Sequence, residues 1–250
     1  MKLRQDTEAY YKKLFPKVEL PFVETDPEYA ERFCEFAFNE VVNQDDLDDK
    51  SRFLAILAVA LGCQGIELFR LFVPAAINSG LTPTEIREVV YQATDYLGLG
   101  RVLPFINTFN EIMRKLGIDI PLANQSTTTL ETRLAAGEQA QIDIFGECMR
   151  GYSESGPAET KHINKWLTAN CFGDYYTRKG LSLKERELIT FCFLAAQGGC
   201  EPQLLVHAKA NFSLGNDKQF LIKIVPQCVP YIGYPRTLNA LSALNKADQN

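Results

Sequence analysis

The sequence predicts an all-α protein built from two tandem copies of one helical repeat. Apolar residues recur at helical spacing in most segments, and the sequence lacks the alternating runs between hairpin turns that indicate strands. The chain also matches itself, since Leu47 and Arg52 correspond to Leu181 and Arg186 within similar apolar segments. A self-match of this kind is typical of a duplicated structural unit.

The first copy begins after a segment with little helical character. Residues 1–30 contain several prolines and no strong apolar period, so we expect an extended N-terminal arm. Asp48 is expected to cap the helix that contains the run FLAILAVALG. Thr82 and Glu85 form a capping box ahead of a second apolar helix, with a proline at the first helical position.

A polar stretch that contains a proline, residues 118–130, predicts the joint between the two copies. The first copy and its arm then occupy residues 1–120, and the second copy occupies residues 121–250. Residues 131–150 are expected to form a helix that leads into the second copy.

The second copy carries its own helix signals. Ser182 and Glu185 form a capping box ahead of an apolar run, and residues 201–214 are expected to be helical. Pro226 and Pro230 should kink or end the last helix, because a proline ring clashes with the preceding helical turn.

Composition excludes several classes of partner. The 250 residues are 46% hydrophobic, enough for a sizeable core, and carry a net charge of −5 without a basic block. We therefore expect no nucleic-acid partner. No apolar run reaches the roughly 18 residues of a membrane span, and the N-terminus lacks the apolar centre of a signal peptide. The predicted location is the cytoplasm, without membrane association.

The cysteines do not predict a disulfide scaffold or a metal centre. The sequence has seven of them, an odd number, and none are arranged as C-x-x-C. Only two histidines are present, so a zinc site is not expected. We expect neither a metal nor an organic cofactor.

Two segments resemble the repeat of the carboxymuconolactone decarboxylase family. LSLKERELITFCFLAAQGGCEPQLLVHAKANFSLG resembles its first half, and GLTPTEIREVVYQATDYLGLGRVLPFINTFNEI resembles its second half. The resemblance implies the all-helical fold of alkylhydroperoxidase D and a small-molecule substrate. It also implies a homo-oligomer, since duplicated chains of this family commonly form trimers that imitate hexamers.

The resemblance implies two chemistries, and one position departs from both patterns. In the thiol-dependent peroxide reductases, a C-x-x-C precedes a histidine, and here Cys200 and His207 stand at the first cysteine and the histidine. Gln203 replaces the second cysteine. In the decarboxylases a glutamate often stands four residues before the histidine, and that position is again Gln203.

Candidate roles follow for the residues of the second copy. Cys200 should lie at a helix N-terminus, where the helix dipole can stabilise a thiolate and lower the pKa. His207 is the candidate acid or base, and Glu187 the carboxylate that orients it. Arg186 could bind a substrate carboxylate or pair with an acidic neighbour across an interface. Two further candidates for substrate contact are Gln203 and Arg236.

The first copy differs at the histidine. His207 precedes Gly215 by eight residues, whereas Phe72 holds the corresponding place before Gly80. A phenyl ring cannot transfer protons, so we expect the first copy to be a packing scaffold. Three functions remain open: a decarboxylase-like enzyme, a thiol-dependent peroxide reductase, and a non-catalytic protein that binds a small acid or only assembles.

Overall fold

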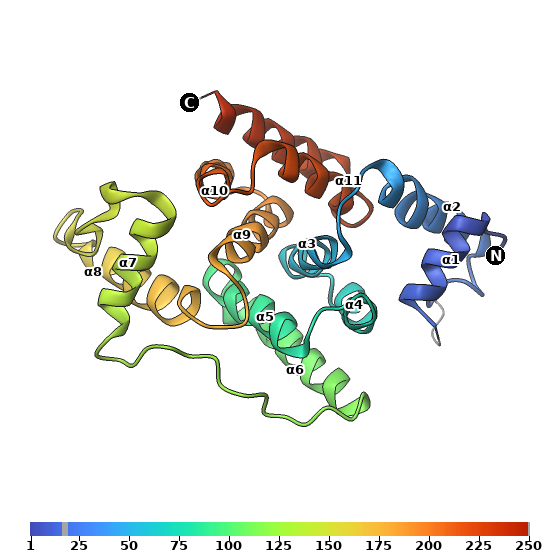
Figure 1. Ribbon diagram of the computed structural model, residues 1–250, viewed down its shortest axis with the longest axis horizontal. Helices are drawn as coiled ribbons and strands as arrows, with labels where there is room; N and C mark the ends of the chain where they lie inside the picture. Colours follow the sequence, from blue (N-terminus) through green and yellow to red (C-terminus); the bar gives the residue numbers. More distant parts are fainter. Residues whose placement is uncertain (17–19, 250) are drawn as a thin grey trace.

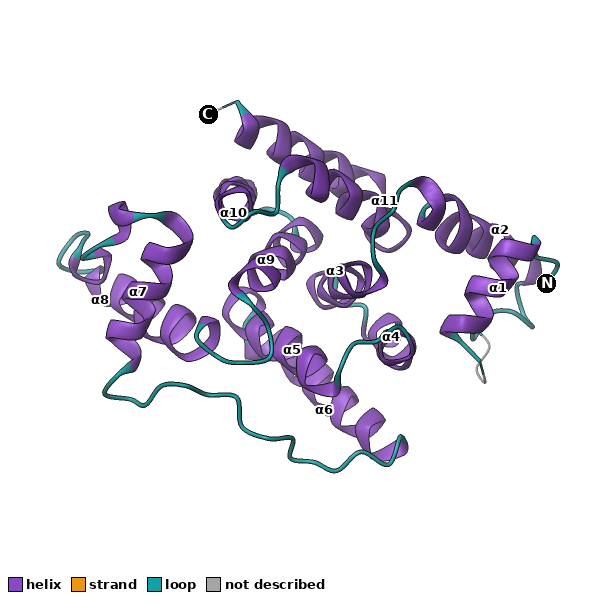
Figure 2. Cartoon of the chain, in the orientation of Figure 1, coloured by secondary structure: helices purple, strands orange, loops and turns teal. Residues whose placement is uncertain are grey.

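The computed structural model describes residues 1–16 and 20–249 and is all-α, as predicted (Figures 1 and 2). Within these ranges the chain forms no strand. Its α-helices are α1 (Gln5–Leu14), α2 (Pro27–Glu35), α3 (Asp49–Gly62), α4 (Ile66–Asn78), α5 (Pro83–Leu97), α6 (Leu99–Lys115), α7 (Arg133–Phe145), α8 (Lys161–Trp166), α9 (Leu183–Gln197), α10 (Glu201–Ser213) and α11 (Lys218–Asp248). Two segments are π-helical, η1 (Phe36–Glu40) and η5 (Leu167–Tyr176), and three are short 3₁₀ turns, η2 (Val42–Gln44), η3 (Glu147–Met149) and η4 (Tyr152–Glu154).

Helices α3 and α9 lie side by side and parallel at the centre of the molecule (Figure 1). At their N-terminal ends, the Lys50 ammonium of α3 lies 2.7 Å from the Glu185 carboxylate of α9. At their C-terminal ends, a Cβ atom on Gly62 would lie only 2.7 Å from the Ala196 Cβ. The two helices therefore pack closely along their whole length.

Reciprocal hydrogen bonds confirm that the chain contains two copies of one unit. Arg52 of the first copy donates from Nε to Gln227 Oε1 of the second at 3.0 Å. Arg186 of the second copy donates from Nη1 to Gln92 Oε1 of the first at 2.8 Å. All four side chains are buried. Each copy thus supplies one arginine and one glutamine to the interface, which relates the copies by an approximate two-fold axis.

The predicted helix caps are confirmed. Asp48 accepts a hydrogen bond from the first turn of α3, and complete capping boxes begin α5 and α9. In each box, the N-cap hydroxyl accepts from a backbone N–H and the glutamate accepts from the N-cap residue. Local sequence is enough to start these helices, because the orphan N–H groups find partners within three residues.

The N-terminal segment corrects one expectation. We expected an extended arm over residues 1–30, but residues 5–14 form α1, which packs against α4 and η1. Tyr11 and Leu14 of α1 and the C-cap residue Phe15 are buried in the main core. Tertiary packing of this short apolar face stabilises a helix that its local pattern did not predict.

The last helix corrects a second expectation. Neither Pro226 nor Pro230 ends α11; the chain leaves helical geometry at Gly233, with φ of 76° and ψ of 168°. Gly98 adopts nearly the same conformation, φ 78° and ψ 150°, between α5 and α6 of the first copy. Glycine reaches positive φ at little steric cost, so both copies break at the glycine.

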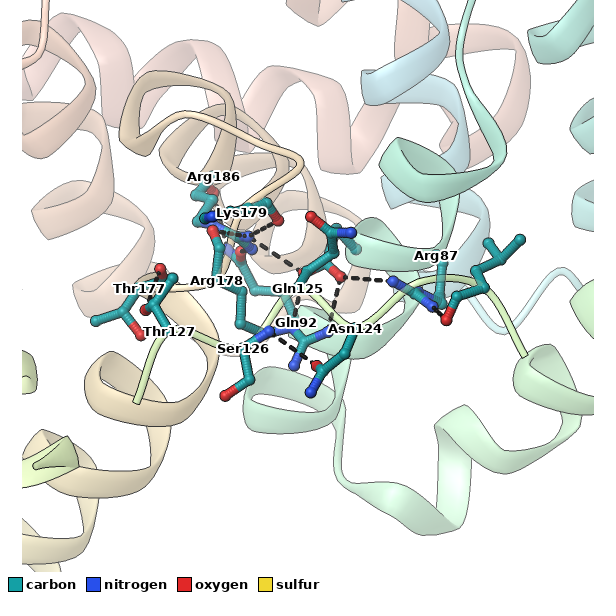
Figure 3. A network of polar contacts seen from close by, with 12 residues as sticks. Arg87, Gln92, Asn124, Gln125, Ser126, Thr127, Thr177, Arg178, Lys179 and Arg186 are labelled. Carbon is teal, nitrogen blue, oxygen red and sulfur yellow. Dashed lines mark hydrogen bonds and ion pairs between the residues drawn. The ribbon is translucent and has the colours of Figure 1, made fainter. Parts of the chain in front are cut away.

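A long non-helical segment joins the two copies along one side of the molecule (Figure 1). It follows α6 and contains the predicted joint, residues 118–130. The Arg87 guanidinium donates to two of its carbonyl groups at 3.0 and 2.7 Å, and the Lys179 N–H donates to the Gln125 carbonyl at 2.9 Å (Figure 3). The segment is thereby held against both copies.

A second, smaller apolar cluster lies beside the main core and includes residues of η5, α7 and α10. Its members include Ile144, Phe172 and Tyr176. Helix α7 and η5 approach each other so closely that a Cβ atom on Gly137 would lie 1.9 Å from the Thr168 carbonyl oxygen. Besides α7, η5 packs against α8 and α5, and its Tyr176 side chain forms hydrogen bonds with α9. In the part of the chain described, no helix is both long and apolar enough to cross a membrane.

We expect the substitution Gly137→Ala to lower the free energy of unfolding by about 1–3 kcal/mol, because the added methyl group overlaps the backbone of η5. The matched control is Gly100→Ala in α6, where nothing lies within 4 Å of the added Cβ. That variant should gain roughly 0.5–1 kcal/mol from helix propensity. Urea denaturation measures both, and equal stability of the two variants would contradict the close approach.

Candidate active site

The side chains of Glu187 and His207 meet in the buried space between α9 and α10, at the distance of an ion pair. The Glu187 Oε2 atom lies 2.7 Å from His207 Nδ1. Glu187 is fully buried, and His207 is 8% exposed. The Asn211 side chain donates to the backbone carbonyls of both residues at 2.8 Å, so the two helices are tied together directly behind the pair. The predicted partnership of these two residues is therefore geometrically possible as it stands.

The second oxygen of Glu187 belongs to a network of hydroxyl groups. Tyr176 donates its O–H to Glu187 Oε1 at 2.8 Å. The Tyr176 oxygen also lies 2.8 Å from the Thr190 hydroxyl and 2.6 Å from the Tyr96 hydroxyl. Burial raises the pKa of both tyrosines well above the usual value, so both remain protonated hydroxyl groups.

Aromatic rings surround the imidazole of His207. The ring centroids of Tyr96 and Phe145 lie 5.6 and 5.7 Å from the His207 ring, at interplanar angles of 81° and 73°. The Nδ1 atom is taken by Glu187, and Nε2 has no hydrogen-bond partner among the described residues. Of the two ring nitrogens, Nε2 is therefore the one that remains available for a further hydrogen bond.

The site draws on both copies. We expected it to lie within residues 121–250, but Tyr96 comes from the end of α5 in the first copy. Its hydroxyl completes the network at Tyr176, and its ring packs against His207. The second copy alone lacks this wall.

The corresponding place in the first copy is filled by apolar side chains. Phe72 stands where the second copy has the histidine, and Phe53 follows Arg52 as the glutamate follows Arg186. The Phe72 ring centroid lies 6.1 Å from that of Phe53 and 5.3 Å from that of Tyr231. No proton-transferring pair can form there, because both partners have become phenyl rings.

Cys200 lies apart from this cluster. It is the N-cap residue of α10, as predicted, but its thiol donates to the Leu194 carbonyl at 3.3 Å. Burial raises the pKa of Cys200 above the usual thiol value, while the nearby Gln197 amide acts in the opposite direction. The direction is opposite to the expected lowering of the pKa, because desolvation of the half-buried thiol is the largest influence on it.

The predicted substrate-binding residues also lie elsewhere. Arg186 is fully buried and donates to Glu88 at 3.2 Å, so of its two predicted roles the structure shows the pairing across the interface. Gln203 is exposed on α10. The Arg236 guanidinium lies next to Gly198, with Nε 3.6 Å from where a Cβ would stand. None of the three forms a hydrogen bond with the imidazole of His207 among the described residues, and Gln203 lies one turn before His207 on the same helix.

Asp95 and Cys171 interact with each other, and Cys171 also interacts with Tyr96; sequence patterns did not single out either residue for the site. Burial raises the pKa of Asp95 to about 8. The hydrogen bond with the Cys171 thiol lowers this pKa, and the negative charge of Asp174 raises it further. The Oδ2 atom of Asp95 is buried without a hydrogen-bond partner among the described residues. Burial and the Asp95 charge in turn raise the pKa of Cys171 well above the usual value.

Comparison with known proteins identifies the family. The sequence model of the carboxymuconolactone decarboxylase family matches this chain twice, at residues 27–107 and 162–246. The chain belongs to the carboxymuconolactone decarboxylase family. The two matches cover the two structural copies, which agrees with a tandem duplication.

Two relatives extend this result. A 4-carboxymuconolactone decarboxylase of Acinetobacter baylyi is 27% identical over 112 residues, which cover 44% of this chain and 83% of that protein. A crystal structure from Burkholderia xenovorans, provisionally named a gamma-carboxymuconolactone decarboxylase subunit, aligns with a TM-score of 0.57 and 19% identity. The alignment covers 97% of this chain and 96% of the other. At that identity, it describes a shared fold alone.

Tyr176, Tyr96 and Thr190 are the members of the network that sequence reasoning missed. A signal existed for Tyr96, because the segment YLGLGR recurs as YIGYPR in the second copy. That match marked a shared position but not its contact with His207. Nothing in the local sequence marks Tyr176, which lies 11 residues before Glu187 on a different element.

We expect alkylation of Cys200 by iodoacetamide to require a higher pH than an ordinary thiol does, because burial raises its pKa. The substitution His207→Ala should leave that pH dependence unchanged, since the imidazole is not among the groups that act on Cys200. Peptide mass spectrometry follows the labelling, with the exposed Cys148 as internal reference. A reactive Cys200 at neutral pH that depends on His207 would contradict this geometry.

We expect Asp95→Asn to stabilise the protein in a pH-dependent way. The folded protein holds the Asp95 proton up to about pH 8, whereas the ordinary pKa is 3.8. As the pH rises between these two values, the unfolded chain loses the Asp95 proton while the folded protein keeps it. The free energy of unfolding of the native protein should therefore fall, relative to that of the variant, by up to about 1.4 kcal/mol for each pH unit. Thermal unfolding at pH 4 and pH 8 measures the difference. A variant whose advantage is the same at both values would show that Asp95 ionises normally.

Proposed function

We propose that this protein is a decarboxylase-like lyase that acts on a small carboxylic acid or lactone, with His207 as general acid and base. The observation that carries the proposal is the buried pair of Glu187 and His207, whose imidazole packs against aromatic rings and keeps Nε2 free of a hydrogen-bond partner among the described residues. Membership of the carboxymuconolactone decarboxylase family supports the reaction class. The Acinetobacter baylyi relative suggests 4-carboxymuconolactone as the first substrate to test.

The geometry suits a proton that leaves the substrate and returns to it. Nε2 accepts the proton of the substrate carboxyl group, and Glu187 stabilises the resulting imidazolium. The bond between the carboxylate carbon and the ring carbon then breaks, and its electron pair passes into the conjugated carbonyl system as a dienolate. The imidazolium returns the proton to carbon, so that carbon dioxide is the only other product.

The aromatic walls contribute by excluding water from this exchange. The rings of Tyr96 and Phe145 pack in T-shaped geometry against the imidazole and cover part of it with apolar surface. An ion pair between a substrate carboxylate and the imidazolium is stronger in such surroundings than in water. The imidazolium, and not Arg186, would therefore bind the substrate carboxylate, because the Arg186 guanidinium is held in the interface between the copies.

The structure favours this function over the two others predicted from sequence. A peroxide reductase needs a reactive thiolate, and burial raises the pKa of Cys200. A protein that only assembles does not need a buried glutamate with three hydroxyl groups arranged behind it. Such a cluster lowers the free energy of unfolding unless the buried carboxylate is fully hydrogen-bonded, because removing its charge from water is costly.

We expect His207→Gln to lower kcat for 4-carboxymuconolactone by about 10²–10⁴-fold, the usual contribution of a positioned acid or base. Glu187→Gln should also lower kcat, because the imidazolium loses its charged partner. The matched control is His162→Gln, which alters the other histidine, an exposed residue of α8. Decarboxylation is followed by absorbance and carbon dioxide release. Full activity of His207→Gln would overturn the proposal.

A further inference from the structure

The two aromatic rings that pack against the imidazole of His207 are held in different ways. His207 is only 8% exposed, so a substrate of several carbon atoms reaches the imidazole only if a neighbouring side chain moves. The Tyr96 hydroxyl lies 2.6 Å from that of Tyr176, and the Tyr96 ring centroid lies 6.1 Å from that of Phe193. Phe145 has no polar group, so packing alone holds its side chain. Of the two rings, Phe145 is therefore the one that moves at the lower cost.

Phe145 is partly exposed, whereas the two rings that it packs against are buried. Its ring centroid lies 5.7 Å from that of His207 and 5.7 Å from that of Phe172. A partly exposed ring in contact with a buried imidazole covers part of that imidazole. Movement of the Phe145 ring toward solvent would uncover His207 without breaking a hydrogen bond of the Phe145 side chain.

The position of Phe145 in the chain favours such a movement. It is the last residue of α7, and Gly146 follows with φ of 92° and ψ of 178°. Gly146 and the two residues after it are exposed, and the Gly146 N–H donates locally to the Ile142 carbonyl at 2.8 Å. Helix α7 lies at the periphery of the molecule, away from α3 and α9 (Figure 1). Local opening is least costly where few buried apolar contacts must be broken.

The first copy contains the same ring contact in a buried form. Phe15 is the C-cap residue of α1, and its ring lies 5.8 Å from that of Phe72 at an interplanar angle of 72°. The values for Phe145 and His207 are 5.7 Å and 73°. Phe15 is only 6% exposed and belongs to the main core, whereas Phe145 lies beside the smaller apolar cluster. The equivalent ring is thus partly exposed only in the copy that has an imidazole beneath it.

We propose that the Phe145 ring is the cover of the candidate site, that substrate reaches His207 by displacing it, and that its size limits which acids are admitted. The cover closes over the imidazole when the site is empty and opens toward solvent to admit substrate. Its role as a determinant of substrate choice rests on the proposed function. Its role in access to His207 does not, because access can be measured without turnover.

Diethyl pyrocarbonate labelling measures this access. The reagent transfers an ethoxycarbonyl group to an unprotonated imidazole nitrogen and releases carbon dioxide and ethanol. The chain has only two histidines, and the exposed His162 serves as the internal reference. Relative to His162, Phe145→Ala should label His207 about tenfold faster than the native protein does, because a covered group reacts only during opening. Phe145→Leu should give a smaller increase. Peptide mass spectrometry follows both sites.

The matched control is Phe15→Leu, which alters the equivalent ring of the first copy. It removes a similar contact from a more deeply buried position and should leave His207 labelling at the native rate. A native rate in Phe145→Ala would overturn the inference. Equal acceleration by Phe15→Leu and Phe145→Leu would overturn it too, because both variants would then act by loosening the whole fold. If Phe145→Ala does not fold, the two leucine variants decide the question.

Substrate choice is tested with 4-carboxymuconolactone and a ring-methylated analogue. Phe145→Ala should raise the kcat/KM of the analogue relative to that of the parent compound by about tenfold or more, the usual discrimination for one methyl group in a pocket. An unchanged ratio would show that Phe145 does not limit substrate size. Absence of turnover in the native protein would instead contradict the proposed function, while the labelling rates would still decide whether Phe145 covers His207.

Discussion

The packing of α3 against α9, with an arginine from each copy buried in the interface, is the constraint on which the rest of the structure depends. A buried guanidinium must find partners, since removing its charge from water carries a large desolvation penalty. Arg52 finds Gln227, and Arg186 finds Gln92 and Glu88, so each arginine needs the other copy. Neither copy can leave the interface without exposing or orphaning these groups.

The same interface supports the site. Glu187 follows Arg186 directly in α9, and Thr190 lies one turn further along the helix. Because Arg186 faces the first copy, its neighbours on α9 are turned toward Tyr176, and His207 approaches from α10. Burial of an isolated carboxylate would destabilise the fold. For Glu187 this cost is offset by the Tyr176 hydroxyl group and the His207 imidazole.

The two copies differ in the side chains buried at corresponding positions. In the first copy Phe53 and Phe72 replace the polar pair and join a cluster of aromatic rings, which needs no hydrogen-bond partners. In the second copy the corresponding volume holds Glu187 and His207, each satisfied by specific contacts. The two copies thus differ in what their buried side chains require, since only the second has a carboxylate and an imidazole at these positions.

Local sequence determined the elements whose partners lie within a few residues. The capping boxes of α5 and α9, the start of α10 after Cys200 and the correspondence of Arg52 with Arg186 could all be predicted, because hydrogen bonds at helix ends and apolar periodicity are local properties. Glu187 and His207 could be paired as well, through the family pattern. Tertiary structure alone decided the helix over residues 5–14, the raised pKa of Cys200 and the contact of Tyr96 with Tyr176, residues 80 positions apart. Burial and long-range contact set these features, and neither is encoded in the spacing of neighbouring residues.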